Sequence, residues 1–106
     1  MDNQARLQLV AQADTVADLA HHIGWTEVVL PKLQKMKELY TQVLVNAVLS
    51  NKPPFLDGQE TTREQLAGRV YGIDYIMRLM DEIIRKGTRA LSDLEAQGVT
   101  IDSKLH

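Results

Sequence analysis

The sequence contains no cysteine. Disulfide bonds, thiolate metal ligands and a cysteine nucleophile are therefore excluded together, and a reducing compartment is compatible with this composition. The N-terminal residues Met1–Gln4 are polar and lack the basic-then-apolar order of a secretory signal peptide. We expect a cytoplasmic protein.

Long hydrophobic runs are also lacking. The most apolar stretch, Leu39–Leu49, is interrupted by Gln42 and Asn46. It is shorter than the roughly 20 apolar residues that a membrane-spanning helix needs. The sequence therefore predicts no association with a membrane.

No excess of either charge is present. Twelve basic and fourteen acidic residues give a formal net charge of −2, whereas proteins that bind nucleic acid through its phosphates usually carry a basic excess. Glycine-rich phosphate loops, dinucleotide-binding glycine patterns and serine nucleophile elbows are absent as well. We expect no enzymatic activity and no cofactor, and nucleic acid is a less favoured partner.

What the sequence does contain is helical periodicity. With 106 residues, 44% hydrophobic and 25% charged, the chain has the composition of one folded domain. Apolar residues recur at steps of four and three, which is typical of helices packed lengthwise against each other. The predicted fold is all-α, either a three-helix bundle or a long helical hairpin with a packed N-terminal helix and coiled-coil-like seams. The predicted helices are 3–23, 26–50 and 62–97, with a loop at 51–61 and a loose tail at 98–106.

The third helix carries the clearest stripe, which we call the seam. Its members alternate in steps of four and three: Leu66, Val70, Ile73, Met77, Met80, Ile84, Gly87, Leu91 and Leu94. Gly87 either bends this helix or allows another helix to cross closely, because it has no side chain. Gly98 is expected to end the helix.

The first helix has a similar stripe, formed by Leu9, Ala13, Val16, Ala17, Ala20 and Ile23. Gly24 is expected to stop this helix in a left-handed conformation. Thr26 is the predicted N-cap of the second helix. Pro31 then either kinks this helix or marks the start of its regular part, since proline is tolerated only in the first turn.

Between the second and third helices, Asp57-Gly58 predicts a turn. We expect Phe55 and Leu56 to pack inward and order the loop. The segment Thr62–Gln65 matches a capping box, in which the threonine and glutamine side chains bind free amides at the start of a helix.

A second stripe on the third helix faces away from the seam and contains Gly68, Gly72, Tyr75 and Leu79. Two helical glycines each cost about 1 kcal/mol relative to alanine, and they are tolerated where something packs closely. That neighbour is either the loop with Phe55 or another protein chain. In the second case Tyr75 would be an aromatic anchor.

The second helix has more apolar surface than a two-helix contact needs, including Leu39, Leu44, Val45 and Leu49; Ile76 and Ile83 of the third helix add to it. Either the first helix covers this surface or it mediates self-association. A homo-oligomer is therefore predicted.

Opposite charges on the third helix alternate at four-residue spacing: Asp74–Arg78, Asp81–Arg85 and Arg89–Asp93. They form either a solvated helix face or a docking edge for a partner. The basic residues among them, with Lys86, carry the alternative hypothesis of a small regulator that binds nucleic acid.

His21 and His22 lie one helical turn from Asp18, and Asp14 lies one turn earlier. This spacing could place metal ligands on one helix face. Histidines in the last turn of a helix also interact favourably with its negative end, and we favour that interpretation over a metal site.

The segment from Leu56-Asp57-Gly58-Gln59-Glu60 through Gly68 and Gly72 to Ile84 resembles small helical proteins of tailed phages, which are encoded among virion-assembly genes. The resemblance covers about a third of the chain and transfers no functional residue. It implies a role in virion assembly, in the host cytoplasm or the virion. Taken together, the sequence predicts a non-enzymatic assembly or adaptor protein that acts through helix-face contacts.

Overall fold

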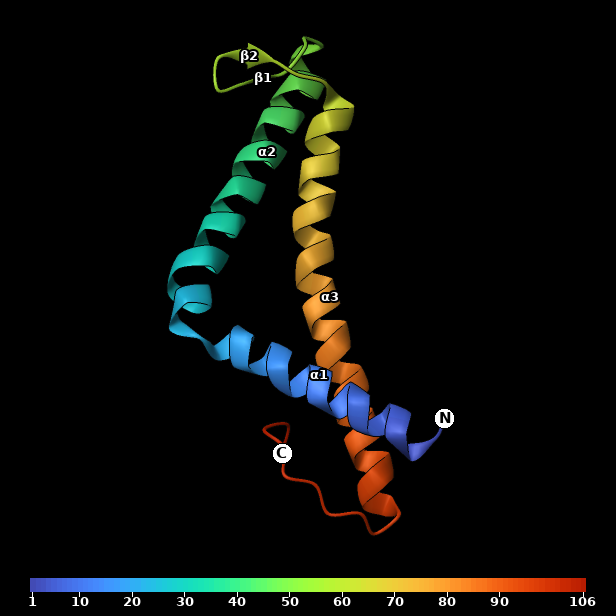
Figure 1. Ribbon diagram of the computed structural model, residues 1–106. Helices are drawn as coiled ribbons and strands as arrows, with labels where there is room; N and C mark the ends of the chain where they lie inside the picture. Colours follow the sequence, from blue (N-terminus) through green and yellow to red (C-terminus); the bar gives the residue numbers. More distant parts are fainter. The chain divides into compact units, whose positions relative to one another are not determined.

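The computed structural model describes residues 1–106 and is all-α apart from one very short β-hairpin (Figure 1). The elements are α1 (Asn3–His21), a π-helix η1 (Gly24–Val29), α2 (Leu30–Ser50), β1 (Phe55–Leu56), β2 (Gln59–Glu60) and α3 (Arg63–Ala96). The predicted fold class is confirmed. None of these helices is both long enough and apolar enough to span a membrane.

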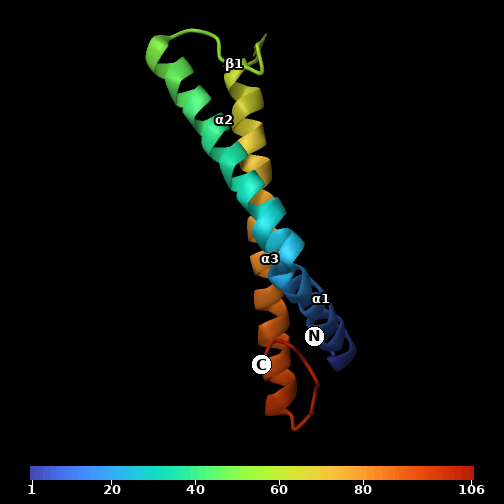
Figure 2. The same cartoon turned by 90° about the vertical axis from the view of Figure 1, so that its left-hand side faces the viewer.

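The contacts of the chain divide it into two compact units. The terminal unit contains residues 1–26 and 77–106, and the middle unit contains residues 27–76. α3 is a single helix that contributes its first part to the middle unit and its second part to the terminal unit (Figures 1 and 2). Every residue of the predicted seam of α3 is buried or half-buried, and Leu66 and Leu94 are fully buried.

In the terminal unit, α1 crosses the second part of α3 (Figure 1). The crossing is close at Gly87, where an added Cβ atom would lie 2.1 Å from the Cβ of Ala13. The absence of a side chain at Gly87 therefore allows the two helices to meet. The core of this unit contains Val10, Ala90, Leu91 and Leu94. Of these, Val10 lies outside the stripe predicted for the first helix.

α1 ends at His21, two residues earlier than predicted. The predicted left-handed stop at Gly24 is wrong, because the positive φ angles occur elsewhere in the chain. Instead His22 is extended, and its Nδ1 accepts a hydrogen bond from the backbone N–H of Gly24 at 3.0 Å. Ile23 is exposed and so does not continue the buried stripe.

The start of the second helix also differs from the prediction. Thr26 lies inside the π-helix η1 and is not an N-cap, and its hydroxyl donates to the carbonyl of His22. α2 begins at Leu30, so Pro31 falls in its first turn. The π-helix η1 runs directly into α2, and Val29 has helical φ and ψ angles of −72° and −51°, so Pro31 lies where the chain changes from π-helix to regular α-helix. Of the two alternatives for Pro31, the start of the regular helix is the one observed.

In the middle unit, polar and aromatic contacts hold α2 against the first part of α3. The guanidinium of Arg63 donates to the carbonyl oxygen of Ala47 at 3.1 Å, near the end of α2. The guanidinium of Arg69 lies 5.4 Å from the ring centroid of Tyr40, which is buried. This distance is within the range of a cation–π interaction. α2 and the first part of α3 therefore face each other in this unit.

The predicted loop contains an antiparallel hairpin, with Phe55 opposite Glu60 and Leu56 opposite Gln59. Asp57 and Gly58 both have positive φ angles, as a tight two-residue hairpin turn of type I′ requires. Leu56 is buried as predicted, but Phe55 is 60% exposed and its predicted inward packing is wrong. Successive residues of a strand point to opposite faces, so both could not be buried on the same side.

Both ends of α3 are capped. Thr62 accepts a hydrogen bond from the backbone N–H of Gln65 at 3.1 Å, which is one half of the predicted capping box. The glutamine side chain instead accepts from the hydroxyl of Thr61 at 2.7 Å. At the other end Gly98 is left-handed, with φ of 81°, and the N–H of Val99 donates to the carbonyl of Leu94. This pattern is a Schellman motif, so the predicted stop at Gly98 is confirmed.

Candidate functional site

The stripe of α3 that faces away from its seam is exposed except at Gly72, which is half-buried. It contains the predicted Gly68, Gly72, Tyr75 and Leu79, and at 3.6 residues per turn Tyr71 and Ile76 belong to the same side. The side chains of Tyr75 and Leu79 are 51% and 41% exposed. We call these six residues the outer face of α3.

Nothing in the chain packs on the glycines of the outer face. A Cβ atom added to Gly68 or to Gly72 would meet no atom within 4 Å. Of the two alternatives for a close neighbour, the loop with Phe55 is therefore not the one observed. Glycine in a helix is less favourable than alanine by about 1 kcal/mol, and no contact within this chain offsets that loss.

Two tyrosines of the outer face form a pair. The rings of Tyr71 and Tyr75 stack with centroids 6.2 Å apart and an angle of 30° between their planes. Sequence reasoning overlooked Tyr71, although its position four residues before Tyr75 places the two side chains next to each other on a helix. The stacked pair gives the outer face a broad aromatic surface.

The candidate interface residues of α2 are exposed but do not share one side of the helix. Leu39 and Val45 are separated by six positions, which corresponds to roughly 120° around an α-helix. Leu49, the most exposed of them at 80%, lies beside Val45 and the exposed Val48 near the end of α2. The last turns of α2 therefore carry an apolar patch of Val45, Val48 and Leu49.

A cleft of about 400 Å³ lies next to the last turns of α2. Its lining is mainly apolar, and Lys52 is the charged residue in it. The lining residues are Val43, Asn46, Ala47, Ser50, Lys52, Pro53, Pro54 and Phe55. The hydroxyl of Ser50 donates to the carbonyl of Asn46 at 2.7 Å, so it is already used within the helix.

The candidate docking charges of α3 have different surroundings. Asp74 forms an ion pair with Lys37 of α2 at 2.6 Å, inside the middle unit. Arg78, Asp81 and Arg85 line a surface groove together with Glu82. At four-residue spacing within α3, Lys86 pairs with Glu82 at 3.2 Å. Their roles in docking and in binding nucleic acid stay predictions.

The histidines considered as metal ligands contact the backbone of their own helix end. His21 Nδ1 lies 2.8 Å from the carbonyl oxygen of Ala17, and His22 Nδ1 accepts from Gly24. The nearby carboxylates of Asp14 and Asp18 bind the C-terminal segment instead. No group of three or more potential ligands is placed to hold a metal ion.

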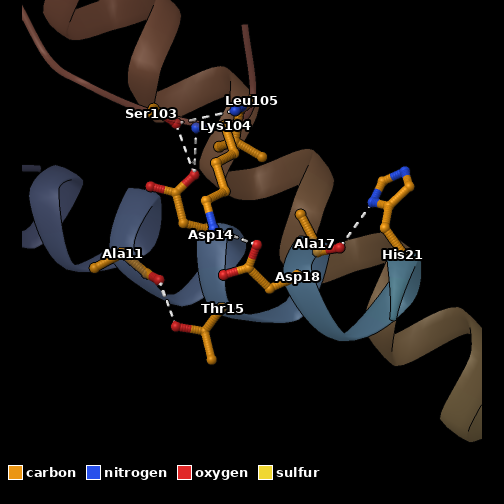
Figure 3. A network of polar contacts seen from close by, with 9 residues as sticks. All are labelled: Ala11, Asp14, Thr15, Ala17, Asp18, His21, Ser103, Lys104 and Leu105. Carbon is orange, nitrogen blue, oxygen red and sulfur yellow. Dashed lines mark hydrogen bonds and ion pairs between the residues drawn. The ribbon is translucent and has the colours of Figure 1, made fainter. Parts of the chain in front are cut away.

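The predicted loose tail is wrong, because residues 99–106 fold back onto α1 (Figure 3). Asp14 Oδ1 accepts hydrogen bonds from the hydroxyl of Ser103 at 2.7 Å and from the backbone N–H of Lys104 at 3.1 Å. Asp18 Oδ1 accepts from the ammonium of Lys104 at 2.5 Å. We call these contacts of Asp14 and Asp18 with Ser103 and Lys104 the C-terminal clasp.

The clasp also affects the protonation of Lys104. The hydrogen bond from Lys104 to Asp18, and then the negative charge of Asp18, raise the pKa of the Lys104 ammonium above its ordinary value of 10.5. Asp14 adds a smaller electrostatic contribution in the same direction. An ammonium beside carboxylates holds its proton more tightly because the charged form is stabilised.

Apolar contacts accompany the clasp. Val99, Ile101 and Leu105 pack against the core cluster of the terminal unit. Beyond them, Nε2 of His106 lies 3.2 Å from a carboxylate oxygen of Glu95. Sequence reasoning missed this docking: the alternation of Val99 and Ile101 is compatible with a packed segment, but it does not show where the segment packs.

Comparisons of this chain with protein-family models, with curated proteins and with solved structures give no match. The outer face of α3 and the C-terminal clasp are the two features of the molecule that point to a function.

Proposed function

We propose that this protein is a non-enzymatic assembly or adaptor component that acts through helix-face contacts with other protein chains. The observation that carries the proposal is the outer face of α3, where Tyr71, Tyr75, Ile76 and Leu79 expose apolar surface beside two glycines. Contiguous exposed apolar surface is characteristic of interaction sites. Aromatic residues on such surfaces often contribute most of the binding energy.

A second copy of the chain is the partner that we propose first. Gly68 and Gly72 leave the backbone of α3 open on this side, so another helix can approach closely. In a two-fold dimer the same surface is used by both copies, and each would place Tyr75 next to the glycines of the other. The exposed Leu39, Val45 and Leu49 of α2 are further candidates for such contacts.

The resemblance to small tailed-phage proteins extends the proposal to a virion or morphogenesis component. Helical proteins of this size suit that role because two-fold dimers can associate further through a second, different surface, and head-to-tail contacts between copies can close into rings. Detection of the chain in purified phage particles would support a role in the virion. Its absence both from phage particles and from their assembly intermediates would contradict a role in virion assembly.

The helix-face contact is tested by removing its apolar groups. The double variant Tyr75→Ser/Leu79→Gln should weaken self-association about tenfold or more, measured by light scattering over a range of concentrations. The free energy of unfolding should change little, because both side chains are exposed. Leu19→Gln in α1 is the matched control, since Leu19 is similarly exposed and lies on another helix.

Three results would contradict the proposal. The wild-type chain could remain monomeric at high concentration and retain no protein partner on an affinity column. The double variant could associate as strongly as the wild type. The control could weaken association as much as the double variant, which would show that the outer face has no special role.

A further inference from the structure

We propose that the C-terminal segment Val99–His106 of one copy exchanges with the same segment of a second copy, so that each segment docks on the Asp14–Asp18 surface of the other chain. The inference rests on the proposed assembly function, because it names a second copy as the partner. The site is the surface of α1 and α3 that the C-terminal segment covers. The ligand is a segment without helix or strand, in which the apolar Val99 and Ile101 precede the hydroxyl of Ser103 and the ammonium group of Lys104.

The segment is built as a separable ligand. It contains no helix or strand of its own, and it leaves α3 at Gly98, a single left-handed residue. Its polar contacts with α1 are made by Ser103 and Lys104. None of these contacts depends on the segment and α1 belonging to the same molecule, so an identical segment from another copy can form them all.

The docking is open to water at its charged groups. The side chains of Lys104 and Asp18 are 67% and 55% exposed, and the pair of His106 and Glu95 is exposed to a similar degree. Water competes with exposed ion pairs, which therefore hold a segment only weakly. The segment can detach while α1 and α3 remain packed at Gly87 and Ala13.

When the C-terminal segment detaches, the apolar surface that it covered becomes exposed to water, which is unfavourable. Val10, Ala90, Leu91 and Leu94 are buried in the presence of Val99, Ile101 and Leu105. The same apolar residues and the same ammonium group are available on every other copy of the chain. Exchange of an identical element between copies restores each contact, which makes it a low-cost route to association.

The protein concentration determines whether the segment docks within its own chain or on a second copy. A segment tethered through one residue is present at its own site at an effective concentration on the order of millimolar. Docking within one chain therefore dominates in dilute solution, and exchange becomes favourable when the chains are concentrated, as they are in an assembly.

The test makes docking unfavourable within a chain and favourable between chains. Asp18→Lys places a lysine opposite Lys104, and in a second chain Lys104→Asp places an aspartate opposite Asp18. Each variant alone brings like charges together in its own clasp. In a mixture, both segments find the opposite charge on the other chain.

Fluorescence resonance energy transfer measures the exchange. The donor fluorophore is attached to one variant and the acceptor fluorophore to the other. The chain has no cysteine, so Gln8→Cys on the exposed side of α1 gives a single labelling position. We expect transfer in the mixture to exceed that of labelled wild-type chains by about fivefold or more at the same concentration. The double variant Asp18→Lys/Lys104→Asp is the control, because its charges match within one chain and its transfer should equal the wild-type value.

Two results would overturn the proposal. One is transfer in the mixture no greater than between wild-type chains, with both variants folded by circular dichroism. The other is transfer that persists when Ile101→Asp is added to both chains, because association would then not require the segment. Adding Tyr75→Ser/Leu79→Gln to both chains separates the two hypotheses: exchange should survive it even if the outer face proves to have no role.

Discussion

A Cβ atom built on Gly87 would lie 2.1 Å from the Cβ of Ala13 and 2.8 Å from the carbonyl oxygen of Leu9. The second part of α3 and the middle of α1 therefore meet backbone to backbone. The neighbours of Gly87 are a methyl group and a carbonyl oxygen fixed on a helix, so neither can rotate away. A contact of this kind sets how far apart α1 and α3 lie in the terminal unit.

Gly87→Ala should destabilise the protein by about 1–3 kcal/mol, as insertion of a methyl group into a filled space usually does. The higher helix propensity of alanine, about 1 kcal/mol, offsets only part of this loss. Urea unfolding followed by circular dichroism measures the change. An unchanged or increased free energy of unfolding would show that the two helices do not cross closely at Gly87.

Gly68→Ala and Gly72→Ala should have the opposite effect. Each position lies inside α3 with no atom near enough to contact an added methyl group. The expected gain is about 0.5–1 kcal/mol per substitution, because alanine loses less backbone entropy than glycine when the helix forms. The measurement is made on dilute protein, where association is weakest. Destabilisation under these conditions would mean that part of the chain packs on the outer face.

The seam of α3 could be predicted because the buried side of a helix is determined by the spacing of apolar residues that are close in the sequence. Leu66, Ile73 and Leu94 are buried because residues at steps of four and three lie on one side of a helix, whatever they pack against. The same spacing gave two alternatives for Gly87, a bend or a close crossing, and the structure shows the close crossing. The strands β1 and β2 could not be predicted from such spacing, because each contains only two residues and shows no periodic pattern.

The C-terminal clasp could not be predicted, because it joins residues that are distant in the sequence. Asp14 and Ser103 are 89 positions apart. A carboxylate on a helix surface and a serine in a polar tail are each compatible with full exposure to water, so neither shows which partner it finds. The outer face is an intermediate case. Its apolar residues could be recognised from their helical spacing, but the sequence does not show whether another part of the chain packs on them.

Thr62→Ala should remove the cap of α3. The hydroxyl of Thr62 accepts from the amide of Gln65, which has no acceptor within the helix at that position. The expected loss is about 1 kcal/mol in the free energy of unfolding. Thr61→Val is the comparison, because the hydroxyl of Thr61 donates to the side chain of Gln65 rather than capping a backbone amide and should contribute less. Equal effects of the two substitutions would contradict the assignment of Thr62 as the cap.

The C-terminal clasp should open at alkaline pH. The pKa of Lys104 is raised in the folded chain by its hydrogen bond with Asp18 and by the charge of that carboxylate. A group whose pKa is higher in the folded state contributes its stabilisation fully at pH values below the ordinary value of 10.5. This contribution is lost as the pH rises through the folded-state pKa, because the neutral amine no longer pairs with Asp18.

The titration can be followed at two places by carbon-13 NMR between about pH 9 and about pH 12. The Cε shift of Lys104 should show a midpoint above 10.5, and the methyl shifts of Ile101 and Leu105 should move toward free-peptide values over the same range. In Asp18→Asn the midpoint of Lys104 should fall toward 10.5, because the charge that favours the ammonium is removed. If the midpoint of Lys104 were the same in both proteins, Asp18 would not be its partner in solution. If the methyl shifts stayed constant while Lys104 titrated, the apolar residues would hold the segment in place without the clasp.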